Sequence, residues 1–402
     1  GTLVPPPHVM FGASAWWCGL LLSGGRVAAV GSGEIKLPSW VSNPVARHVA
    51  CPVAADTPTA CRLEGFEEAG LELEYRIKSL PAVGTLYETS PNFRSYGGDP
   101  KEAPDPIGPH QLPFLLTDPQ HRVVYVPPFN ARPPEARWTS FTYVVSAAAP
   151  PEDGGVATTS EEGFGVLVSS DGRIAGSNFD LADGGDGWSI SGNLNDGPAG
   201  GLKHQAFTFG GLQHYVYGVD EVQYTDFATD LEQSKWYFEA SVGSFHGPEL
   251  AAAYGGVLRF TVRALYGNFT ELNDPLDWVT LECASCNNGN GIRLVRFVDD
   301  FLWWDGSEKV VELRLSPHGR WMRDPLNSAL EFTNASECDI AVVLSNVTRL
   351  AILGDFTRGG EGVALDDVAI AVDPAAQPAC PLGCQQGCAC VHNPELRRPT
   401  CC

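Results

Sequence analysis

The sequence contains no apolar run that approaches the roughly 18 residues a membrane-spanning helix needs. Its apolar residues are instead spread through the 402 positions in short stretches separated by polar and small residues. We therefore expect no direct insertion into a membrane by this chain.

Basic residues are scarce as well. Lysine and arginine number 26 against 48 aspartates and glutamates, which gives a formal net charge of −22. A surface that binds nucleic acid needs basic side chains to neutralise phosphates, so this balance argues against nucleic acid as a partner. Acidity of this kind usually reflects solubility and sometimes calcium binding.

Motifs of common catalytic chemistry are missing. The sequence has no nucleophile elbow, phosphate loop or dinucleotide fingerprint. His204, His214 and His246 lack the i, i+4 partner and glutamate of a zinc hydrolase helix. Cys283 and Cys286 have metal-ligand spacing, but no second pair follows at zinc-finger distance. Acidic pairs occur throughout, so no glycosidase pair stands out. The sequence favours a protein that is not an enzyme.

Long helical periodicity is also absent, whereas turn-forming glycine and proline are plentiful. Apolar and polar residues alternate over Leu258–Ala264 and Val311–Leu315, which predicts strands with one buried face. Antiparallel sandwiches have such sheets. One helix is predicted over Ser336–Val347, where an apolar stripe follows a start signal, and Leu350–Phe356 returns to strand. We expect an all-β, multi-domain chain of antiparallel β-sandwiches.

Six segments between Phe179 and Ala371 resemble the landmarks of a laminin IV type A domain (the laminin B module). They are Phe179-Asp180-Leu181, Gly187-Trp188, Trp236-Tyr237-Phe238, Phe245-His246-Gly247, Ala253–Phe260 and Leu365–Ile370. The resemblance covers about half of the chain. It implies a non-enzymatic jelly-roll sandwich of an extracellular protein over residues 176–373.

Residues 45–146 resemble the cadherin-like, immunoglobulin-like repeats of large surface proteins. The segments that carry this resemblance are Gly84–Tyr87, Val123–Pro127 and Phe141–Val145, and Leu71–Ile77 alternates as a half-buried strand. Such repeats serve as spacers and adhesive links. Residues 147–175, rich in proline, glycine and acidic residues, are predicted to be a linker and a strand lead-in.

Both ends suggest a piece of something longer. Residues 1–44 contain two apolar segments joined by a glycine turn, a β-hairpin that resembles one blade repeat of a propeller of the regulator-of-chromosome-condensation type. A blade needs neighbours, so either further blades precede it or this is an ordinary hairpin, and both interpretations stay open. Residues 374–402 resemble a short epidermal-growth-factor-like module, but the final Cys401-Cys402 pair departs from the family spacing.

Twelve cysteines and three glycosylation sequons indicate the secretory route and an oxidising compartment. The sequons begin at Asn268, Asn334 and Asn346. The cysteines expected in disulfides are Cys51, Cys61, Cys283, Cys286, Cys380, Cys384, Cys388, Cys390, Cys401 and Cys402. Sequence alone does not fix their pairing.

Calcium is the one cofactor that the sequence suggests. Jelly-roll sandwiches related to carbohydrate-binding modules often hold calcium where the first and last strands meet. Here that place would bring Asp180 toward Asp366 and Asp367, whose carboxylates suit a hard cation. The alternative is that Asp366 and Asp367 only end a strand in solvent.

We therefore expect an extracellular or cell-surface protein with a structural or adhesive role, which builds matrix or a surface or flagellar fibre. Its partners would be other copies of itself or other extracellular proteins. Mastigoneme proteins of algal and protist cilia are the specific candidate. A glycan-binding receptor module is the alternative. Trp303 and Trp304 could form a sugar platform, but of two adjacent aromatics on a strand one more often faces the core and the other covers a neighbour. A secreted hydrolase ranks third.

Overall fold

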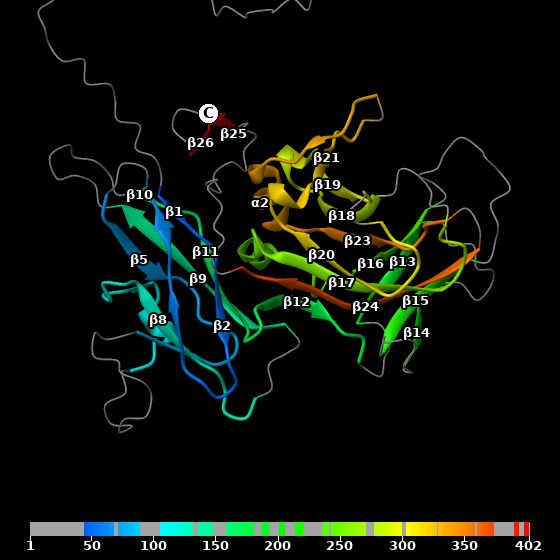
Figure 1. The fold of residues 1–402 in the computed structure, drawn as a ribbon. Helices are drawn as coiled ribbons and strands as arrows, with labels where there is room; N and C mark the ends of the chain where they lie inside the picture. The colour runs from blue at the N-terminus through cyan, green and yellow to red at the C-terminus, as the bar shows by residue number, and fades with distance from the viewer. Residues whose placement is uncertain are drawn as a thin grey trace, which may run out of the picture. The chain divides into compact units, whose positions relative to one another are not determined.

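Strands dominate the described part of the chain (Figure 1). The computed structural model describes residues 44–67, 71–88, 105–131, 136–147, 158–180, 186–192, 201–205, 214–220, 235–240, 243–270, 277–299, 303–327, 329–357 and 360–373, and the backbone of 390–393 and 398–401. The strands form two sandwiches, and the predicted all-β, multi-domain class is confirmed. The predicted propeller-like hairpin over residues 1–44 lies outside the described residues except for position 44.

The first sandwich consists of two facing sheets within residues 49–169 and a short strand pair. One sheet has the strand order β2 (Val49–Val53), β11 (Gly163–Ser169), β9 (Arg137–Ala147), β5 (Leu73–Ile77) and β7 (Phe114–Leu115), and β10 (Thr158–Thr159) also pairs with β9. The facing sheet has the order β3 (Thr59–Arg62), β8 (Arg122–Val126) and β6 (Thr85–Glu88). The short strand pair is β1 (Val45–Ala46) with β4 (Gly65–Phe66). Strands β2 and β11 run parallel, whereas the other pairs are antiparallel. Phe141 and Tyr143 of one sheet and Tyr125 of the other meet in the core.

The predicted linker over residues 147–175 needs a correction. Strands β10 and β11 fall within it, and both belong to the sheet of the first sandwich. Six of the seven residues of β11 are buried. A strand buried on both faces carries no apolar–polar alternation, so the run Phe164–Val168 gave no signal of a half-buried strand. The first sandwich therefore continues past the predicted boundary at residue 146, to Ser169.

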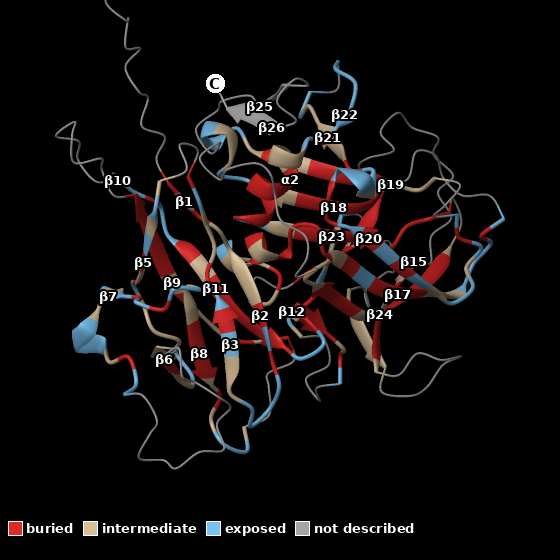
Figure 2. Ribbon diagram, turned by 60° about the vertical axis from the view of Figure 1, so that its left-hand side comes forward, coloured by how far each residue is buried: buried red, intermediate tan, exposed pale blue. Residues whose placement is uncertain are grey.

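The second sandwich occupies residues 173–371. Its first sheet has the strand order β14 (Lys203–Gln205), β15 (Tyr215–Asp220), β24 (Glu361–Ala371), β17 (Val257–Tyr266) and β20 (Lys309–Arg314), and β12 (Arg173–Ser177) also pairs with β24. Its second sheet has the strand order β13 (Ser189–Gly192), β16 (Trp236–Glu239), β23 (Arg349–Leu353), β18 (Asp277–Cys283), β19 (Ile292–Phe297), β21 (Met322–Asp324) and β22 (Thr333–Asn334). All of these pairs are antiparallel. Buried residues line β24 and β17 (Figure 2).

Trp236, one of the landmark aromatics, shows why glycines are needed in this core. Its side chain is fully buried. An added Cβ at Gly354 would lie 2.0 Å from the indole ring, and one at Gly218 would lie 2.6 Å from it. Neither glycine has room for a side chain, so the indole packs directly against two backbones.

The predicted helix is confirmed as α2 (Glu337–Leu344). Ser336 is its N-cap: the Ser336 hydroxyl accepts the Asp339 N–H at 3.1 Å, and Asp339 Oδ2 accepts the Ser336 N–H at 2.9 Å. This capping box satisfies two backbone donors at the helix start. Short 3-10 turns are η2 (Pro109–Gln111), η4 (Pro248–Ala253), η5 (Asn287–Gly289) and η6 (Pro317–Gly319).

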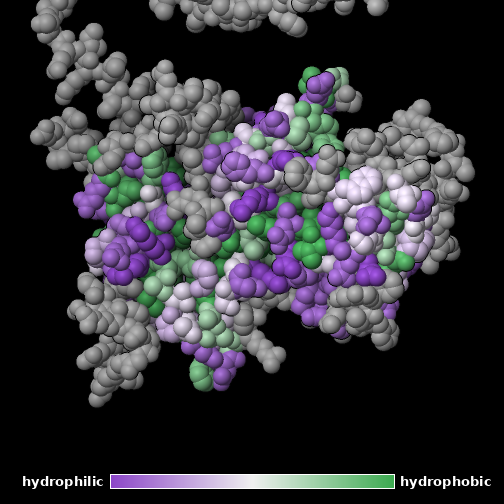
Figure 3. Space-filling view, in the orientation of Figure 1, coloured by the Kyte–Doolittle hydropathy of each residue, from purple (hydrophilic) through white to green (hydrophobic). Residues whose placement is uncertain are grey.

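Two further features complete the described fold. Strands β25 (Cys390–Asn393) and β26 (Arg398–Cys401) form an antiparallel hairpin, and the rest of the predicted growth-factor-like module lies outside the described residues. Leu326 and Leu330 are exposed in the loop between β21 and β22, and at the tip of this loop hydrophobic and hydrophilic side chains lie side by side (Figure 3). No helix among the described residues has the length and apolarity to cross a membrane.

Candidate functional site

The two sandwiches meet at a contact that we call the joint, made by β11, β2 and β9 of the first sandwich and by β12 and η4 of the second. Strand β11 lies at its centre. Leu167 belongs to the core of the first sandwich, whereas Val166 and Val168 belong to the core cluster of the second. All three side chains are fully buried. Because successive side chains of a strand point to opposite faces, one strand contributes to both cores.

Glu249 on η4 makes the polar part of the joint. Its Oε2 lies 3.3 Å from Nη1 of Arg137, and its Oε1 accepts the Ser140 hydroxyl at 3.4 Å. Gly247, with φ +107°, precedes η4, and a Cβ there would lie 2.8 Å from the Glu249 carboxylate. A glycine at this position lets the carboxylate lie close to the backbone. The contact joins β9 of the first sandwich to the second sandwich by charge as well as by apolar packing.

His48 lies beside the same contact. Its Nδ1 accepts the N–H of Phe164 at 3.2 Å, and its ring stacks on the Phe164 ring at 5.4 Å between centroids. Burial lowers the pKa of His48 to about 4, although the nearby Glu249 carboxylate acts in the opposite direction. The imidazole is therefore neutral near pH 7 and serves as a hydrogen-bond acceptor.

A tight turn connects the sandwiches. The N–H of Gly172 donates to the carbonyl of Ser169 at 2.9 Å, and Gly172 has φ +81°. The Gly172 carbonyl in turn accepts the N–H of Val372, just after β24, at 2.9 Å. The turn is thus hydrogen-bonded to the segment that follows the last strand of the second sandwich. With so short a connection, the two sandwiches have little freedom to separate.

A second notable group is a set of buried carboxylates at one end of β24. Asp220, Asp355 and Glu361 are 2%, 4% and 0% exposed. Burial first, and repulsion by Asp220 second, raises the pKa of Asp355 to about 7. Burial first, and repulsion by Asp355 second, raises the pKa of Glu361 to about 9. Asp355 and Glu361 are also hydrogen-bonded to each other. We call these three residues the acid cluster.

The surroundings of the acid cluster are structural. The two oxygens of Glu361 accept the N–H groups of Phe356 at 2.7 Å and Thr357 at 3.1 Å, which fixes the loop before β24. Nearby, Asp277 accepts the ammonium of Lys235 at 2.7 Å and the hydroxyl of Tyr237 at 2.8 Å. Glu361 thus holds this loop in place through two backbone donors, and all three acids of the cluster are buried from solvent.

The predicted calcium ligands Asp366 and Asp367 lie on β24. The first strand of the domain, β12, does pair with this last strand, as expected. Asp367, however, lies 3.2 Å from Nη1 of Arg173 and 4.0 Å from Nη2 of Arg259. Asp366 Oδ1 accepts the N–H of Asp367 at 2.7 Å. The Asp367 carboxylate is thus neutralised by two guanidinium groups, which would compete with a cation.

The third predicted calcium ligand, Asp180, follows β12. Its Oδ2 accepts the amide of Asn178 at 2.7 Å, and its Oδ1 lies 3.9 Å from Nε2 of His214. Over the residues that the structure describes, no group of three or more histidine, cysteine, aspartate or glutamate side chains is arranged to hold a metal ion. Calcium stays a prediction from the sequence.

The three sequons differ in geometry, although Asn268, Asn334 and Asn346 are all exposed. Asn268 Oδ1 accepts both the N–H and the hydroxyl of Thr270, at 3.3 and 2.7 Å. Nδ2 of Asn346, the atom that a glycan would modify, instead donates to the Ser285 hydroxyl at 2.6 Å. The Asn346 sequon is thus the one whose acceptor nitrogen is already engaged.

We expect glycan on Asn268 and Asn334 and the lowest occupancy on Asn346. A bulky polar group is accommodated at an exposed site, whereas at Asn346 it would crowd the contact with Ser285. Mass spectrometry of glycopeptides from the secreted protein measures the three occupancies. Thr270→Ala should remove the glycan of Asn268 alone. Full occupancy at Asn346 with Asn268 bare would contradict the ranking.

Two disulfides join cysteines named from the sequence, Cys51 to Cys61 and Cys283 to Cys286. The first connects β2 to β3, one strand from each sheet of the first sandwich. Cys338 on α2 is disulfide-bonded too and was not among the predicted cysteines. It stands far from any other cysteine in the sequence, so no spacing pattern singles it out. The remaining predicted cysteines, Cys380, Cys384, Cys388, Cys390, Cys401 and Cys402, have no described side chains.

The histidines and tryptophans weighed as catalytic or sugar-binding groups have structural contacts. His204 Nε2 lies 2.8 Å from the carbonyl of Phe179, and His246 Nε2 lies 2.7 Å from that of Thr348. Trp304 is 1% exposed and donates its indole N–H to a backbone carbonyl, whereas Trp303 is 53% exposed. Of these candidates, Trp303 alone presents a large surface to a ligand.

No protein-family model and no curated protein matches the chain. Among solved structures, the chain is similar to the L4b domain of human laminin alpha-2, with a TM-score of 0.32 and 13% identity over 50% of this chain and 99% of that chain. It is also similar to an exo-beta-agarase, with a TM-score of 0.28 and 11% identity over 50% of this chain and 25% of that chain. The first is a laminin domain, the kind that the landmarks between Phe179 and Ala371 resemble. Both TM-scores are low, and neither likeness carries an argument about the activity of this chain.

Proposed function

We propose that this chain is a structural or adhesive part of an extracellular protein, and that it works as a stiff two-sandwich spacer. The joint is the observation that carries the proposal. Val166 and Val168 share a core with the second sandwich, Leu167 shares one with the first, and Glu249 bridges to Arg137. A spacer that transmits force or holds spacing needs such a joint, because a flexible linker would yield first.

Cross-linking and surface features support the extracellular setting. The disulfides Cys51–Cys61 and Cys283–Cys286 belong to an oxidising compartment. The exposed sequons at Asn268 and Asn334 suit the secretory route. The acidic surface suits a protein that remains dispersed until it meets a specific partner. Matrix or a surface or flagellar fibre of mastigoneme type is the setting that we propose, with other copies or other extracellular proteins as partners.

The test is the shape and activity of the native material. Negative-stain electron microscopy of the purified protein should show filaments or a periodic assembly in which this chain repeats. Reduction with dithiothreitol is the matched control, and it should disorder the assembly. A compact monomer that hydrolyses a glycoside or ester would overturn the proposal in favour of a secreted hydrolase.

A glycan-binding receptor module is the second candidate. It rests on Trp303, whose side chain is 53% exposed at the second sandwich. An exposed indole can stack on the apolar face of a sugar ring. A glycan array separates the two functions: specific sugar binding that Trp303→Ala removes would favour the receptor module.

A further inference from the structure

Strand β20 (Lys309–Arg314) is an edge strand. It pairs with β17 on one side, and among the described residues no strand pairs with its other side. An edge strand presents unpaired backbone donors and acceptors, which is the usual template for the addition of another strand.

The register shows which peptide groups lie on the outer edge. Just after β20, Leu315 donates its N–H to Gly256 at 2.9 Å and accepts the N–H of Gly255 at 2.8 Å, so its peptide groups point toward the β17 side. In an antiparallel pair the peptide groups of successive residues point alternately toward and away from the partner strand. The peptide groups of Val310, Glu312 and Arg314 therefore point outward. Consistently, the Arg314 carbonyl accepts the indole N–H of Trp321 at 2.7 Å. Trp321 thus covers the end of the edge, and Val310–Glu312 is the part that no other described strand pairs with.

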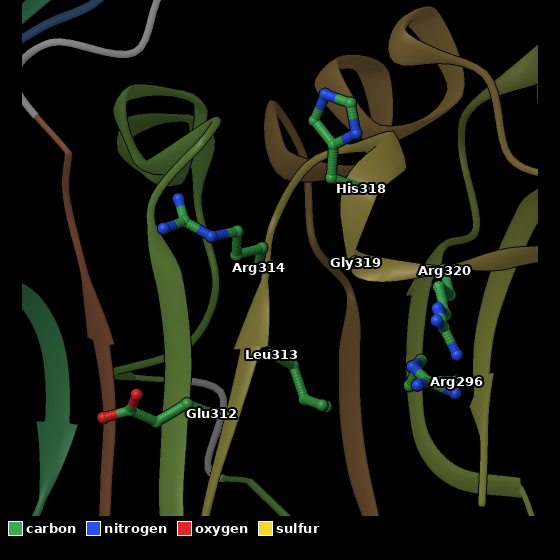
Figure 4. A pocket seen from close by; sticks show the side chains of 7 residues that line it. All are labelled: Arg296, Glu312, Leu313, Arg314, His318, Gly319 and Arg320. Carbon is green, nitrogen blue, oxygen red and sulfur yellow. The ribbon is translucent and has the colours of Figure 1, made fainter. Parts of the chain in front are cut away.

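A cavity of about 300 Å³ opens at this edge, between β20 and the neighbouring sheet. Arg296, Glu312, Leu313, Arg314, His318, Gly319 and Arg320 line it (Figure 4). In that view the side chains of Arg296 and Arg320 lie together on one side of β20, whereas those of Glu312 and Arg314 extend away on the other. The cavity thus combines an exposed strand edge with two guanidinium groups.

Arg296 is the unusual residue of this cavity. It comes from β19, is 5% exposed, and its Nε is buried without a hydrogen-bond partner. Its other nitrogens donate to the Phe297 carbonyl and, at 2.9 Å, to Asp299 Oδ2. The same Asp299 oxygen accepts Nη1 of Arg320 at 3.0 Å. Asp299 thus accepts from both guanidiniums, and among the described residues Nε of Arg296 has no acceptor, which is costly unless a ligand supplies one.

We propose that the outer edge of β20 binds an extended acidic peptide strand, whose backbone pairs with Val310–Glu312 and whose carboxylate lies against Arg296 and Arg320. The peptide backbone supplies hydrogen bonds at strand spacing, and the carboxylate supplies acceptors for the guanidiniums. Glu312 and Asp299 oppose an acidic ligand, whereas Arg314 favours it. A polyanionic glycan would satisfy the guanidiniums but not the alternating peptide groups, so the edge favours peptide.

Fluorescence anisotropy tests the proposal with a labelled short peptide of alternating valine and threonine and one central aspartate. The native protein should bind it, and replacing the aspartate by asparagine should weaken binding about tenfold, as expected for one charge-assisted contact. Arg320→Gln should weaken binding of the aspartate peptide and leave the asparagine peptide unchanged. Added salt should act in the same direction.

Two changes test the backbone pairing separately. Glu312→Pro removes an outward N–H, which an edge strand tolerates, together with the Glu312 carboxylate, and it should abolish binding. Glu312→Ala removes the carboxylate alone and should retain binding. If Glu312→Pro fails to fold, as judged by its melting temperature, the same peptide N-methylated at alternate amides serves instead, and it should not bind the native protein. No binding of the aspartate peptide overturns the proposal. Binding of the peptide to the Glu312→Pro variant, together with binding of the N-methylated peptide to the native protein, would also overturn the proposal. Heparin oligosaccharide binding that needs Arg320 but is unaffected by Glu312→Pro would assign the cavity to glycans.

Discussion

Substituting Val168 with aspartate should destabilise the second sandwich by about 4 kcal/mol or more, among the largest effects of a single substitution. Val168 is fully buried within the core cluster of the second sandwich, although it lies on a strand of the first. An aspartate there would place a carboxylate in an apolar environment without partners. Urea unfolding, followed by circular dichroism, measures the loss.

Paired alanine variants make the test specific to the joint. Leu167→Ala removes packing from the first core and Val168→Ala from the second, and each should cost about 2–4 kcal/mol. Hydrogen exchange with peptide resolution should show the first loss around β5 and β8 and the second around β17 and β24. If both variants increase hydrogen exchange in the first sandwich alone, β11 does not contribute to both cores. That result would also contradict the proposal of a stiff spacer.

The strands and the helix that have one buried and one solvent-exposed face could be predicted from the sequence. Leu258, Phe260 and Val262 are buried in β17 as their alternation predicts, and Arg259 is exposed. The helix α2 was also predictable, because its N-cap Ser336 and its apolar stripe lie within a few residues. Local signals of this kind depend on near neighbours in the sequence alone, which explains why they were reliable.

The joint could not be predicted, because its signal depends on what covers each face. The run Phe164–Val168 is apolar without alternation, and short apolar runs do not reveal whether a strand belongs to one core, to two, or to a linker. Glu249 and Arg137 meet only after both sandwiches have folded. Their separation in sequence is far beyond any helical or strand period, so no motif connects them.

Neither the acid cluster nor the pair of arginines in the cavity could be predicted from the sequence. Asp220, Asp355 and Glu361 come from separate segments that pairing of β15 with β24 brings together. By contrast, Asp366 and Asp367 are adjacent in sequence and suggested a calcium site, yet Asp367 lies beside Arg173 and Arg259. Adjacent carboxylates in the sequence are conspicuous, but the folded surroundings decide whether they face a cation or an arginine. The net charge of −22 likewise gives no sign of a cavity with two arginines.

The acid cluster should make the second sandwich less stable as the pH rises. Burial and mutual repulsion raise the pKa of Asp355 to about 7 and that of Glu361 to about 9. An acid whose pKa is raised by folding stabilises the fold below its ordinary pKa, and this stability is lost as the pH rises toward the folded value. His48 has the opposite effect on stability, because folding lowers its pKa. Its effect is confined to pH values below its ordinary pKa of 6.5.

Asp355 is largely ionised above about pH 7.5, so the window from about pH 7.5 to 8.5 isolates Glu361, with a loss of about 1.4 kcal/mol per pH unit. Melting temperatures of the native protein across this window should fall steadily. Asp355→Asn removes the nearest repelling charge, so it should flatten the fall, while the exposed Glu331→Gln should not change it. A melting temperature that is constant or rises over this window would mean that Glu361 is ionised in the fold. The first explanation to test would then be a stronger interaction of the acid cluster with Lys235, whose ammonium already favours the ionised form of Asp355.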